Sequence, residues 1–460
     1  MPKHEVQTQA ISTFTRPEPK RDSKLESKFE SWGRYPRVAA DLVSLFWAEE
    51  FPPPLPEGSK MLPVGMGRSY GDVCLLENGT LLQTVPMDRF LAFEETTGLL
   101  RCEAGVTLAE ILDFGVPRGW FLPVTPGTKY VTVGGAIAND IHGKNHHIAG
   151  TFGCHVPRFE LVRSSGQRVL CSATENVDWY CATIGGMGLT GLISWAEVQL
   201  RPIRSRRIKY KGIKFVGIEE FVALSQASKN IEYTVAWIDC VAKDENFARG
   251  IFMQGDHSEI PEELNPSPKP KLSMPFEMPA FVLNRSSVGA FNTLYYRKQF
   301  GKEKTGLVDY EPFFYPLDSI LHWNRLYGKE GFLQFQCVLP WASDQTGIVR
   351  VLQAITASGL ASFLAVIKVF GDVPSPGMMS FPEPGITLAL DFPIRPDVSF
   401  DLLDRLADIT AEFGGRMYPA KDARMGAAHF QHFYPQWREF SAYIDPAFES
   451  SFWRRVTALG

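Results

Sequence analysis

The chain has few cysteines, and no two of them are closely spaced. Seven cysteines stand among 460 residues, an odd number with no Cys-x-x-Cys spacing. This usage argues against a disulfide framework and against a cysteine zinc site. It is typical of a protein that works in a reducing cytoplasm.

Long hydrophobic runs are also missing. No run of about eighteen apolar residues occurs, and the most apolar window, residues 360–370, is interrupted by Lys368. We therefore expect no membrane-spanning helix. The N-terminus has no apolar core and no small-residue cleavage site, which argues against a Sec signal peptide. We predict a polar, mobile extension over residues 1–30.

Neither sign of charge is in large excess. Lys and Arg number 47 and Asp and Glu 51, which gives a formal net charge of −4. Proteins that bind nucleic acid usually carry a basic face, so we expect no nucleic-acid partner. The chain is 45% hydrophobic and 21% charged, as in ordinary soluble globular proteins. At roughly 100–200 residues per domain, its length of 460 residues predicts two to four folding units, of which two large domains are the simplest case.

The first half of the chain predicts an α+β fold of short strands, glycine turns and a few helices. Thr107 to Glu110 is a capping box, which predicts the start of a helix after a strand at 99–106. Ser164 to Gly166 predicts a hairpin turn. This part of the chain shows no regular alternation of strand and helix.

Longer elements follow residue 202. Strands are predicted at 207–215, 233–240, 332–339 and 386–392, and an amphipathic helix at 400–413. Six prolines make residues 260–280 a surface loop. We predict a first domain, an inserted domain on an antiparallel sheet flanked by helices, and a C-terminal segment that returns to the first domain. Their expected ranges are 31–205, 206–415 and 416–460.

A glycine-rich loop is the first candidate site. Residues 63–72 read Pro-Val-Gly-Met-Gly-Arg-Ser-Tyr-Gly-Asp. Such spacing lets backbone N–H groups converge on an anion such as a pyrophosphate, although a plain tight loop is the alternative. The residues after Gly71 predict a hairpin, whereas a Rossmann fingerprint must open a helix. No Gly-Lys-Ser/Thr follows either, so a P-loop is not expected.

Two further glycine loops lie at residues 126–145 and 185–193. Three such loops within 130 residues favour one cofactor site, where a flat, phosphate-bearing molecule lies against bare backbone. Four nearby histidines invite a metal interpretation. However, no carboxylate or cysteine is spaced to complete a site, so we predict no metal. These histidines are His142, His146, His147 and His155.

Together with Gly-Gly-Arg-Met-Tyr-Pro-Ala-Lys-Asp-Ala-Arg at 414–424, these motifs resemble the FAD-dependent oxidoreductases of the vanillyl-alcohol oxidase type. The resemblance extends from residue 32 to the last predicted helix. Its most specific parts are residues 142–147 and 418–424, which match the branch that oxidises polyprenylphosphoryl ribose. The resemblance implies a two-part FAD-binding domain with an inserted substrate domain.

The resemblance also implies which residues contact FAD. Many relatives attach the flavin to a histidine where this chain has Tyr70, so non-covalent FAD is expected. The implied cofactor residues are Pro63, Val64, Gly65, Met66, Gly67, Arg68, Ser69, Tyr70, Gly71, Asp72, Val73, Gly127, Thr132, Val133, Gly134, Gly135, Asn139, Asp140, Ile141, His142, Ile193 and Tyr418.

Two residues match catalytic positions of the family. Lys421 corresponds to the active-site lysine, which holds or helps deprotonate the sugar hydroxyl. Its alternative is a solvated lysine beside Asp422. His142 corresponds to the flavin-side histidine, and a core histidine bonded to a backbone carbonyl is its alternative.

The substrate pocket is predicted partly from alternation. Gln334 and Gln336 share one face of the strand at 332–338, where they line either a cavity or a solvent-facing stripe. Lys368 lies in an apolar strand and should meet an anion, either a substrate phosphate or an Asp or Glu partner. By resemblance, four more residues join the pocket, although a buried core position is the alternative for Trp237. They are Trp237, Phe314, Thr387 and Ala389.

The chain departs from its relatives at two positions. Ala389 stands where well-known members carry a cysteine facing the flavin, so nitro-aromatic inhibitors that capture this cysteine are expected to fail. Phe314 and Tyr315 replace a Tyr-His pair, which changes the polarity of the pocket.

The implied reaction is oxidation of the 2′-hydroxyl of a polyprenylphosphoryl ribofuranose to a ketone. A separate NAD(P)H-dependent reductase would complete epimerisation to an arabinose donor for cell-wall glycans, and a quinone-like or other acceptor would take the electrons. The lipid tail implies peripheral membrane contact. We expect a cytoplasmic or inner-membrane location, with the periplasmic side left open. The alternatives are an oxidase of a free sugar or alditol and a non-catalytic flavoprotein.

Overall fold

The computed structural model describes residues 29–458, except for 55, 263, 265–271 and 280–282. The predicted extension over residues 1–30 therefore falls almost wholly outside the described residues. The proline-rich segment 260–280 is described only in part. Within the described ranges, no helix is long and apolar enough to cross a membrane.

Two sheets organise the first region of the chain. An antiparallel five-stranded sheet has the order β4-β5-β9-β7-β8, and a parallel three-stranded sheet has the order β1-β3-β2. The five strands are β4 (Phe90–Glu94), β5 (Leu99–Glu103), β7 (Arg158–Val162), β8 (Arg168–Ser172) and β9 (Leu192–Gln199). The three are β1 (Asp41–Ser44), β2 (Met61–Val64) and β3 (Thr80–Gln83), and a small pair joins β6 (Trp120–Phe121) to β10 (Arg201–Pro202).

Local signals in this region act as predicted, with one exception. Thr107 accepts a hydrogen bond from the Glu110 N–H and caps α1, and β7 and β8 form the predicted hairpin. The hairpin predicted after Gly71 is wrong. Residues 72–74 form a short 3-10 helix, and β3 then pairs in parallel with β2, so the intervening segment is a crossover. The region's helices are α1 (Leu108–Gly115), α2 (Val133–Ala138), α3 (His146–Ala149) and α4 (Val177–Thr183).

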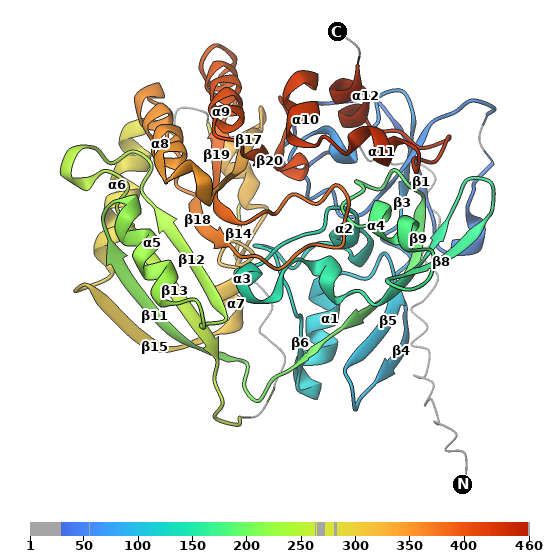
Figure 1. Cartoon of the computed structure of the whole chain (residues 1–460), viewed down its shortest axis with the longest axis horizontal. Coiled ribbons are helices and arrows are strands. Elements are labelled where there is room, and N and C mark those ends of the chain that lie inside the picture. Colours follow the sequence, from blue (N-terminus) through green and yellow to red (C-terminus); the bar gives the residue numbers. More distant parts are fainter. Residues whose placement is uncertain (1–28, 55, 263, 265–271, 280–282, 459–460) are drawn as a thin grey trace.

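The second region is built on an antiparallel sheet of eight strands in the order β15-β11-β13-β12-β18-β19-β17-β20. Three helices, α5, α8 and α9, cover one face and share a hydrophobic core with it (Figure 1). The strands are β11 (Arg207–Phe215), β12 (Tyr233–Ile238), β13 (Gly250–His257), β15 (Glu303–Asp309), β17 (Phe332–Pro340), β18 (Ala365–Phe370), β19 (Gly385–Pro393) and β20 (Arg416–Met417), while β14 (Leu272–Ser273) pairs with β16 (Ile320–Leu321). The helices are α5 (Ile218–Ala227), α6 (Arg285–Lys298), α7 (Tyr310–Phe314), α8 (Thr346–Ser358) and α9 (Asp401–Glu412).

The opposite face of this sheet is the one that matters for function. Because side chains alternate along a strand, the residues that do not face α5, α8 and α9 point toward the first region. We call this surface the inner face. On β17 and β19 it carries Gln334, Gln336, Ala389 and Asp391, which the antiparallel register places side by side.

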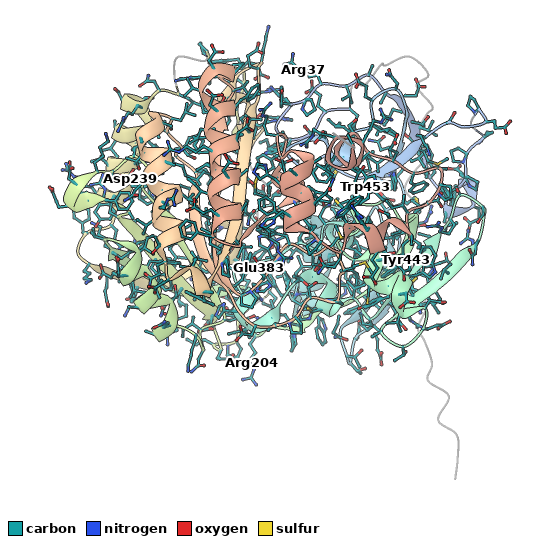
Figure 2. All side chains as sticks on the ribbon, turned by 45° about the horizontal axis from the view of Figure 1, so that its top comes forward. Arg37, Arg204, Asp239, Glu383, Tyr443 and Trp453 are labelled. Atoms are coloured by element: carbon teal, nitrogen blue, oxygen red, sulfur yellow. The ribbon has the colours of Figure 1, made fainter. Side chains whose placement is uncertain are left out.

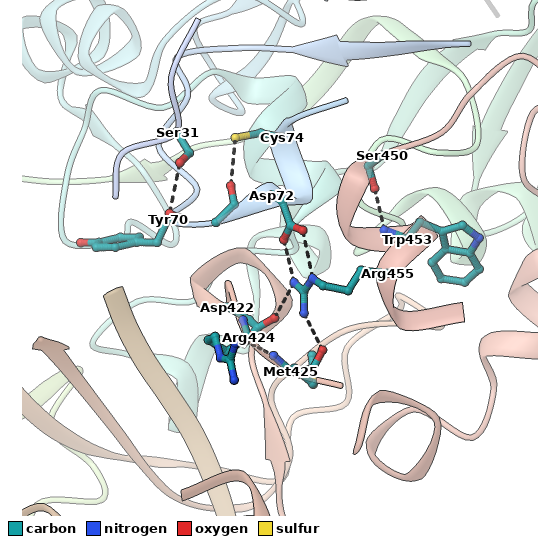
Figure 3. Close-up of polar contacts among 11 residues, drawn as sticks. Ser31, Tyr70, Asp72, Cys74, Asp422, Arg424, Met425, Ser450, Trp453 and Arg455 are labelled. Carbon is teal, nitrogen blue, oxygen red and sulfur yellow. Dashed lines mark hydrogen bonds and ion pairs between the residues drawn. The ribbon is translucent and has the colours of Figure 1, made fainter. Parts of the chain in front are cut away.

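The C-terminal part of the chain connects both regions. β20 adds the last strand to the large sheet, and Arg416 forms an ion pair with Glu383, which is labelled in Figure 2. The helices α10 (Ala427–Phe433), α11 (Trp437–Ser441) and α12 (Ser451–Thr457) follow. Arg455 of α12 bonds both Asp72 and Asp422, which joins the glycine-rich loop to the segment after β20 (Figure 3).

Candidate active site

A cavity of about 860 Å³ lies between the glycine loops and the inner face of the sheet. Residues 63–70 form one wall, and both segments 125–128 and 131–144 contribute. The sheet and the C-terminal segment close the cavity with polar side chains. These are Gln334, Gln336, Lys368, Tyr418 and Lys421.

The glycine-rich loop is held in place by close backbone contacts. Gly67 has a φ of +61°, a conformation that L side chains rarely adopt. A Cβ atom on Gly65 would come within 2.3 Å of Thr132 Oγ1, and one on Gly71 within 1.8 Å of the Asp422 carbonyl oxygen. Arg68 lies over Trp32, and its Nε donates to the Tyr130 carbonyl. These glycines are required by packing.

Lys421 lies at the centre of the cavity wall. Its ammonium is 4.1 Å from the centre of the Tyr70 ring. Burial lowers the pKa of Lys421, and the negative charge of Asp391 partly opposes that shift. Asp422 is bonded to Arg455 and to the N–H groups of Arg424 and Met425 instead. The alternative of a solvated lysine beside Asp422 is therefore wrong.

Asp391 is the main residue that the sequence analysis missed. It is fully buried, Gln334 donates a hydrogen bond to Oδ1, and Oδ2 has no hydrogen-bond partner among the described residues. Burial raises the pKa of this carboxyl. The resemblance assigned Ala389 to the pocket, and alternation along the strand places Asp391 on the same face, so the signal was present in the sequence.

His142 is bonded to a side chain of the sheet. Its Nε2 lies 3.0 Å from Gln336 Nε2, so the imidazole accepts from the amide, and Nδ1 has no partner within the described part of the chain. Gln336 also donates to Thr387 Oγ1, whose hydroxyl donates to the Cys337 carbonyl. Burial holds the pKa of His142 well below its usual range, so the ring is neutral. The alternative of a backbone-bonded core histidine does not describe this contact.

Two more lysines line the cavity. Lys368 Nζ donates to the Gly143 carbonyl at 3.3 Å and Lys144 Nζ to the Phe314 carbonyl at 3.1 Å. Burial lowers the pKa of Lys144 to about 8. Burial and the nearby positive charges lower the pKa of Lys368 to about 7. Both ammonium groups are partly removed from water and have only a carbonyl partner, so this part of the cavity is suited to an anion.

Comparisons with known proteins agree with this geometry. Residues 56–172 match the model of a family described as the FAD binding domain. The chain is 34% identical over 418 residues, 87% of its length and 90% of the relative, to a decaprenylphosphoryl-beta-D-ribose oxidase of Mycolicibacterium smegmatis. This chain belongs to the same family of FAD-binding oxidoreductases.

Two other relatives match as well. An uncharacterized protein in the mprA 5′ region of Streptomyces coelicolor is 30% identical over 377 residues, which cover 76% of this chain and all of that protein. The human Delta(24)-sterol reductase is 29% identical over 126 residues, 27% of this chain and 24% of the reductase. The match to the sterol reductase therefore covers about a quarter of each chain.

The cavity fits the FAD of this family of oxidoreductases. A Cβ atom on Gly127 would meet nothing within 4 Å, so bare backbone borders open space there. His142 Nδ1 has no hydrogen-bond partner among the described residues and could bond a cofactor atom. Tyr418 stacks on Phe381 and donates to the Asn139 carbonyl. The predicted cofactor residues that line the cavity are Pro63, Val64, Gly65, Met66, Gly67, Arg68, Ser69, Tyr70, Val73, Gly127, Thr132, Gly134, Gly135, Asn139, Ile141, His142, Ile193 and Tyr418.

Four predicted cofactor residues lie behind the wall. Gly71 packs against the Asp422 carbonyl, and Asp72 pairs with Arg455. Val133 is fully buried in a hydrophobic core. Asp140 is fully buried and accepts hydrogen bonds from the Gly153 N–H and the Ser380 hydroxyl. We correct their assignment, because these residues support the loops and do not line the cavity.

The predicted substrate residues divide in the same way. Gln334, Gln336, Lys368, Phe314 and Ala389 line the cavity. Trp237 does not, because its indole N–H donates to the Phe363 carbonyl and its ring packs on Tyr295. Thr387 lies behind Gln336. Trp237 and Thr387 are not among the side chains that line this cavity, and both contact residues that do.

The histidine cluster has separate contacts. The Nε2 atoms of His147 and His155 are bonded to the carbonyls of Ile231 and Ala149, and His146 packs on Phe370. Among the described residues, no three His, Cys, Asp or Glu side chains gather as a metal site.

Proposed function

We propose that this protein oxidises the 2′-hydroxyl of a polyprenylphosphoryl-β-D-ribofuranose to a ketone. The observation that carries the proposal is the pair of partly buried lysines, Lys144 and Lys368, in a cavity that fits FAD. A neutral sugar or alditol offers these cations no counter-charge, whereas a phosphodiester does. The name of the Mycolicibacterium relative supports the same substrate class.

Each residue of the cavity has a proposed task. Lys368 and Lys144 bind the phosphate, and Gln334 and Gln336 orient the sugar hydroxyls. Bound FAD supplies a hydride acceptor. Lys421 Nζ accepts the proton of the 2′-hydroxyl, because burial lowers its pKa and makes the neutral amine accessible near neutral pH.

Asp391 acts on this step through Lys421. Its charge raises the pKa of the ammonium, so the carboxylate limits how far burial favours the neutral amine. The apolar side chains that line the cavity limit the access of water to the reacting hydroxyl.

We further propose that FAD is bound without a covalent link. Tyr70 takes the position where many relatives attach the flavin, and its ring lies under the Lys421 ammonium. Denaturation with acid should therefore release all the yellow colour into the supernatant. A flavin that stays with the precipitated protein would contradict this expectation.

The wider assignment follows from the chemistry. The division into an FAD domain at 31–205 with a returning segment at 416–460, and an inserted substrate domain at 206–415, remains our proposal. A quinone-like or other acceptor must take the electrons, and a separate NAD(P)H-dependent reductase would complete epimerisation toward an arabinose donor. We propose a cytoplasmic or inner-membrane location with peripheral membrane contact.

The decisive experiment is an anaerobic visible spectrum before and after addition of a short-chain prenylphosphoryl ribofuranose. Bleaching of the oxidised flavin band is expected, and methylphosphoryl arabinofuranose is the control. A persistent band with the ribose substrate, together with bleaching by a free sugar or alditol, would instead identify an oxidase of neutral sugars. No band after reconstitution with FAD would refute the flavin assignment.

A further inference from the structure

The cavity extends well past the residues that the proposed reaction uses. From Lys368 on β18 it continues along the inner face across β12, β13 and β11 to the edge strand β15. Neighbouring strands are about 4.8 Å apart, so this extension is roughly 14 Å long from β18 to β11. We call it the apolar arm.

The wall of the apolar arm differs sharply from the rest of the cavity. The strand register places Val235, Met253 and Gly212 in one row and Val366, Ile251 and their neighbours in the next, all on the inner face. Charged side chains are confined to its outer end. The residues that line the arm are Tyr210, Val235, Ile251, Met253, Tyr295, Phe313, Leu364 and Val366.

The arm opens at the surface between α6 and β15. The cavity wall there includes Lys298, Lys304 and Leu307. Large apolar side chains are exposed nearby, since Phe300, just after α6, is 92% exposed and Leu294 is 70% exposed. Exposed apolar groups beside lysines are typical of a surface that meets a lipid or a lipid-bearing ligand.

We propose that the apolar arm is the binding site for the first isoprene units of the substrate, with the remaining chain leaving between α6 and β15. This proposal rests on the proposed function. The phosphate on Lys368 and Lys144 fixes one end of the tail, and the arm begins at Lys368 and is lined by apolar side chains. The arm would make turnover depend on chain length.

Gly306 provides a direct test. Gly306 lies opposite Tyr210 in the register of β15 and β11, and Tyr210 lines the cavity. A side chain at position 306 would therefore point toward the cavity. A Cβ atom on Gly306 would meet nothing within 4 Å, and its φ lies outside the left-handed region. Gly306→Leu therefore adds a side chain to the mouth of the arm without straining the backbone. Gly426→Leu is the matched control, because Gly426 is exposed and equally unobstructed.

The experiment measures anaerobic flavin bleaching of the holoenzyme with farnesylphosphoryl and methylphosphoryl ribofuranose. In the wild type, kcat/KM for the farnesyl substrate should exceed that for the methyl substrate at least about tenfold, as expected for apolar groups in a fitted pocket. Gly306→Leu should reduce this ratio by about tenfold, while Gly426→Leu leaves the ratio unchanged. Met253→Trp, which fills the arm from its floor, should act in the same direction.

The proposal and the function on which it rests fail differently. A ratio near one in the wild type, or a ratio unaffected by both filling substitutions, would refute the apolar arm while leaving ribose oxidation intact. Absence of bleaching by either substrate would refute the proposed function. In that case calorimetry can still test the arm by comparing the affinities for farnesyl phosphate and methyl phosphate. If farnesyl phosphate binds no more tightly than methyl phosphate, the arm is refuted as well.

Discussion

The glycine loops and the inner face of the sheet form opposite walls of one cavity, but they are built in different ways. In the loops, the backbone packs closely on neighbouring segments, and at Gly65 and Gly71 there is no room for a Cβ atom. On the inner face, the strand backbone only spaces the side chains, and Gln334, Lys368 and Asp391 carry the chemistry. Substitutions in the loops should therefore affect stability and cofactor binding, whereas substitutions on the inner face should affect turnover.

Lys421→Met should give the largest effect. Loss of a positioned proton acceptor commonly slows a reaction by about 10²–10⁴-fold. We expect flavin reduction by the ribose substrate to slow by about a thousandfold, with FAD still bound and the fold unchanged. Stopped-flow reduction and the visible spectrum measure both effects, and Lys329→Met at an exposed position is the control. Undiminished turnover would instead favour a non-catalytic role for Lys421.

Gly71→Ala should destabilise the wall that the glycine loops form. The added Cβ atom would lie 1.8 Å from the Asp422 carbonyl oxygen, so one of the two segments must move. Overpacking of this kind costs about 1–3 kcal/mol of unfolding free energy or more. We expect a lower melting temperature and weaker FAD binding, while Gly426→Ala changes neither. Wild-type stability in Gly71→Ala would mean that the loops tolerate side chains.

Lys368→Met should weaken binding of the substrate phosphate while it increases the stability of the folded chain. Removal of a charged contact to the phosphate should lower kcat/KM by about 10–100-fold, mainly through KM. The free energy of unfolding should instead increase in the variant. Burial disfavours the charged lysine, since its pKa is about 7 in the folded chain and 10.5 is the ordinary value. Between these pH values the unfolded chain binds more protons, so the folded wild type gains stability as pH rises.

The comparison with Lys368→Met can therefore be made across pH. The variant should be more stable than the wild type at pH 6, and the difference should shrink as pH rises from 7 toward 10.5. Denaturant unfolding at a series of pH values measures this change. If the difference in unfolding free energy between variant and wild type does not change with pH, the pKa of Lys368 is the same in the folded and unfolded chains.

Asp391→Asn should give the smallest change in rate. The amide keeps the shape of the side chain but removes the charge that raises the pKa of Lys421. The pKa of Lys421 should fall, so the rise of kcat with pH should move to lower pH, with kcat at pH 8 within about tenfold of the wild type. An unshifted pH profile would separate Asp391 from the proton transfer.

The sequence predicts the two walls unequally. Alternation located the strands at 207–215, 332–339 and 386–392 to within one or two residues, because each has one face in the core. It also placed Gln334 and Gln336 on one face. The hairpin after Gly71 failed because a local turn signal does not reveal that β3 pairs in parallel with the distant strand β2.

The site residues were likewise predictable where the signal was local in the sequence, and not where it depended on remote contacts. The resemblance identified Lys421 and His142 because they lie in short, specific motifs. Asp391 was missed although the same alternation places it beside Ala389. Asp72 could not be assigned from local sequence, since its partner Arg455 is 383 residues away. Contacts between remote segments decide which motif residues line the cavity and which support it.

The ion pairs of Arg455 also constrain the order of events during synthesis. Asp72 follows the glycine-rich loop, Asp422 follows β20, and their shared partner lies in α12 (Figure 3). The glycine-rich loop is translated early, whereas this contact can form only after residue 455 has emerged from the ribosome. A nascent chain released before that point would lack the ion pairs that join these two segments.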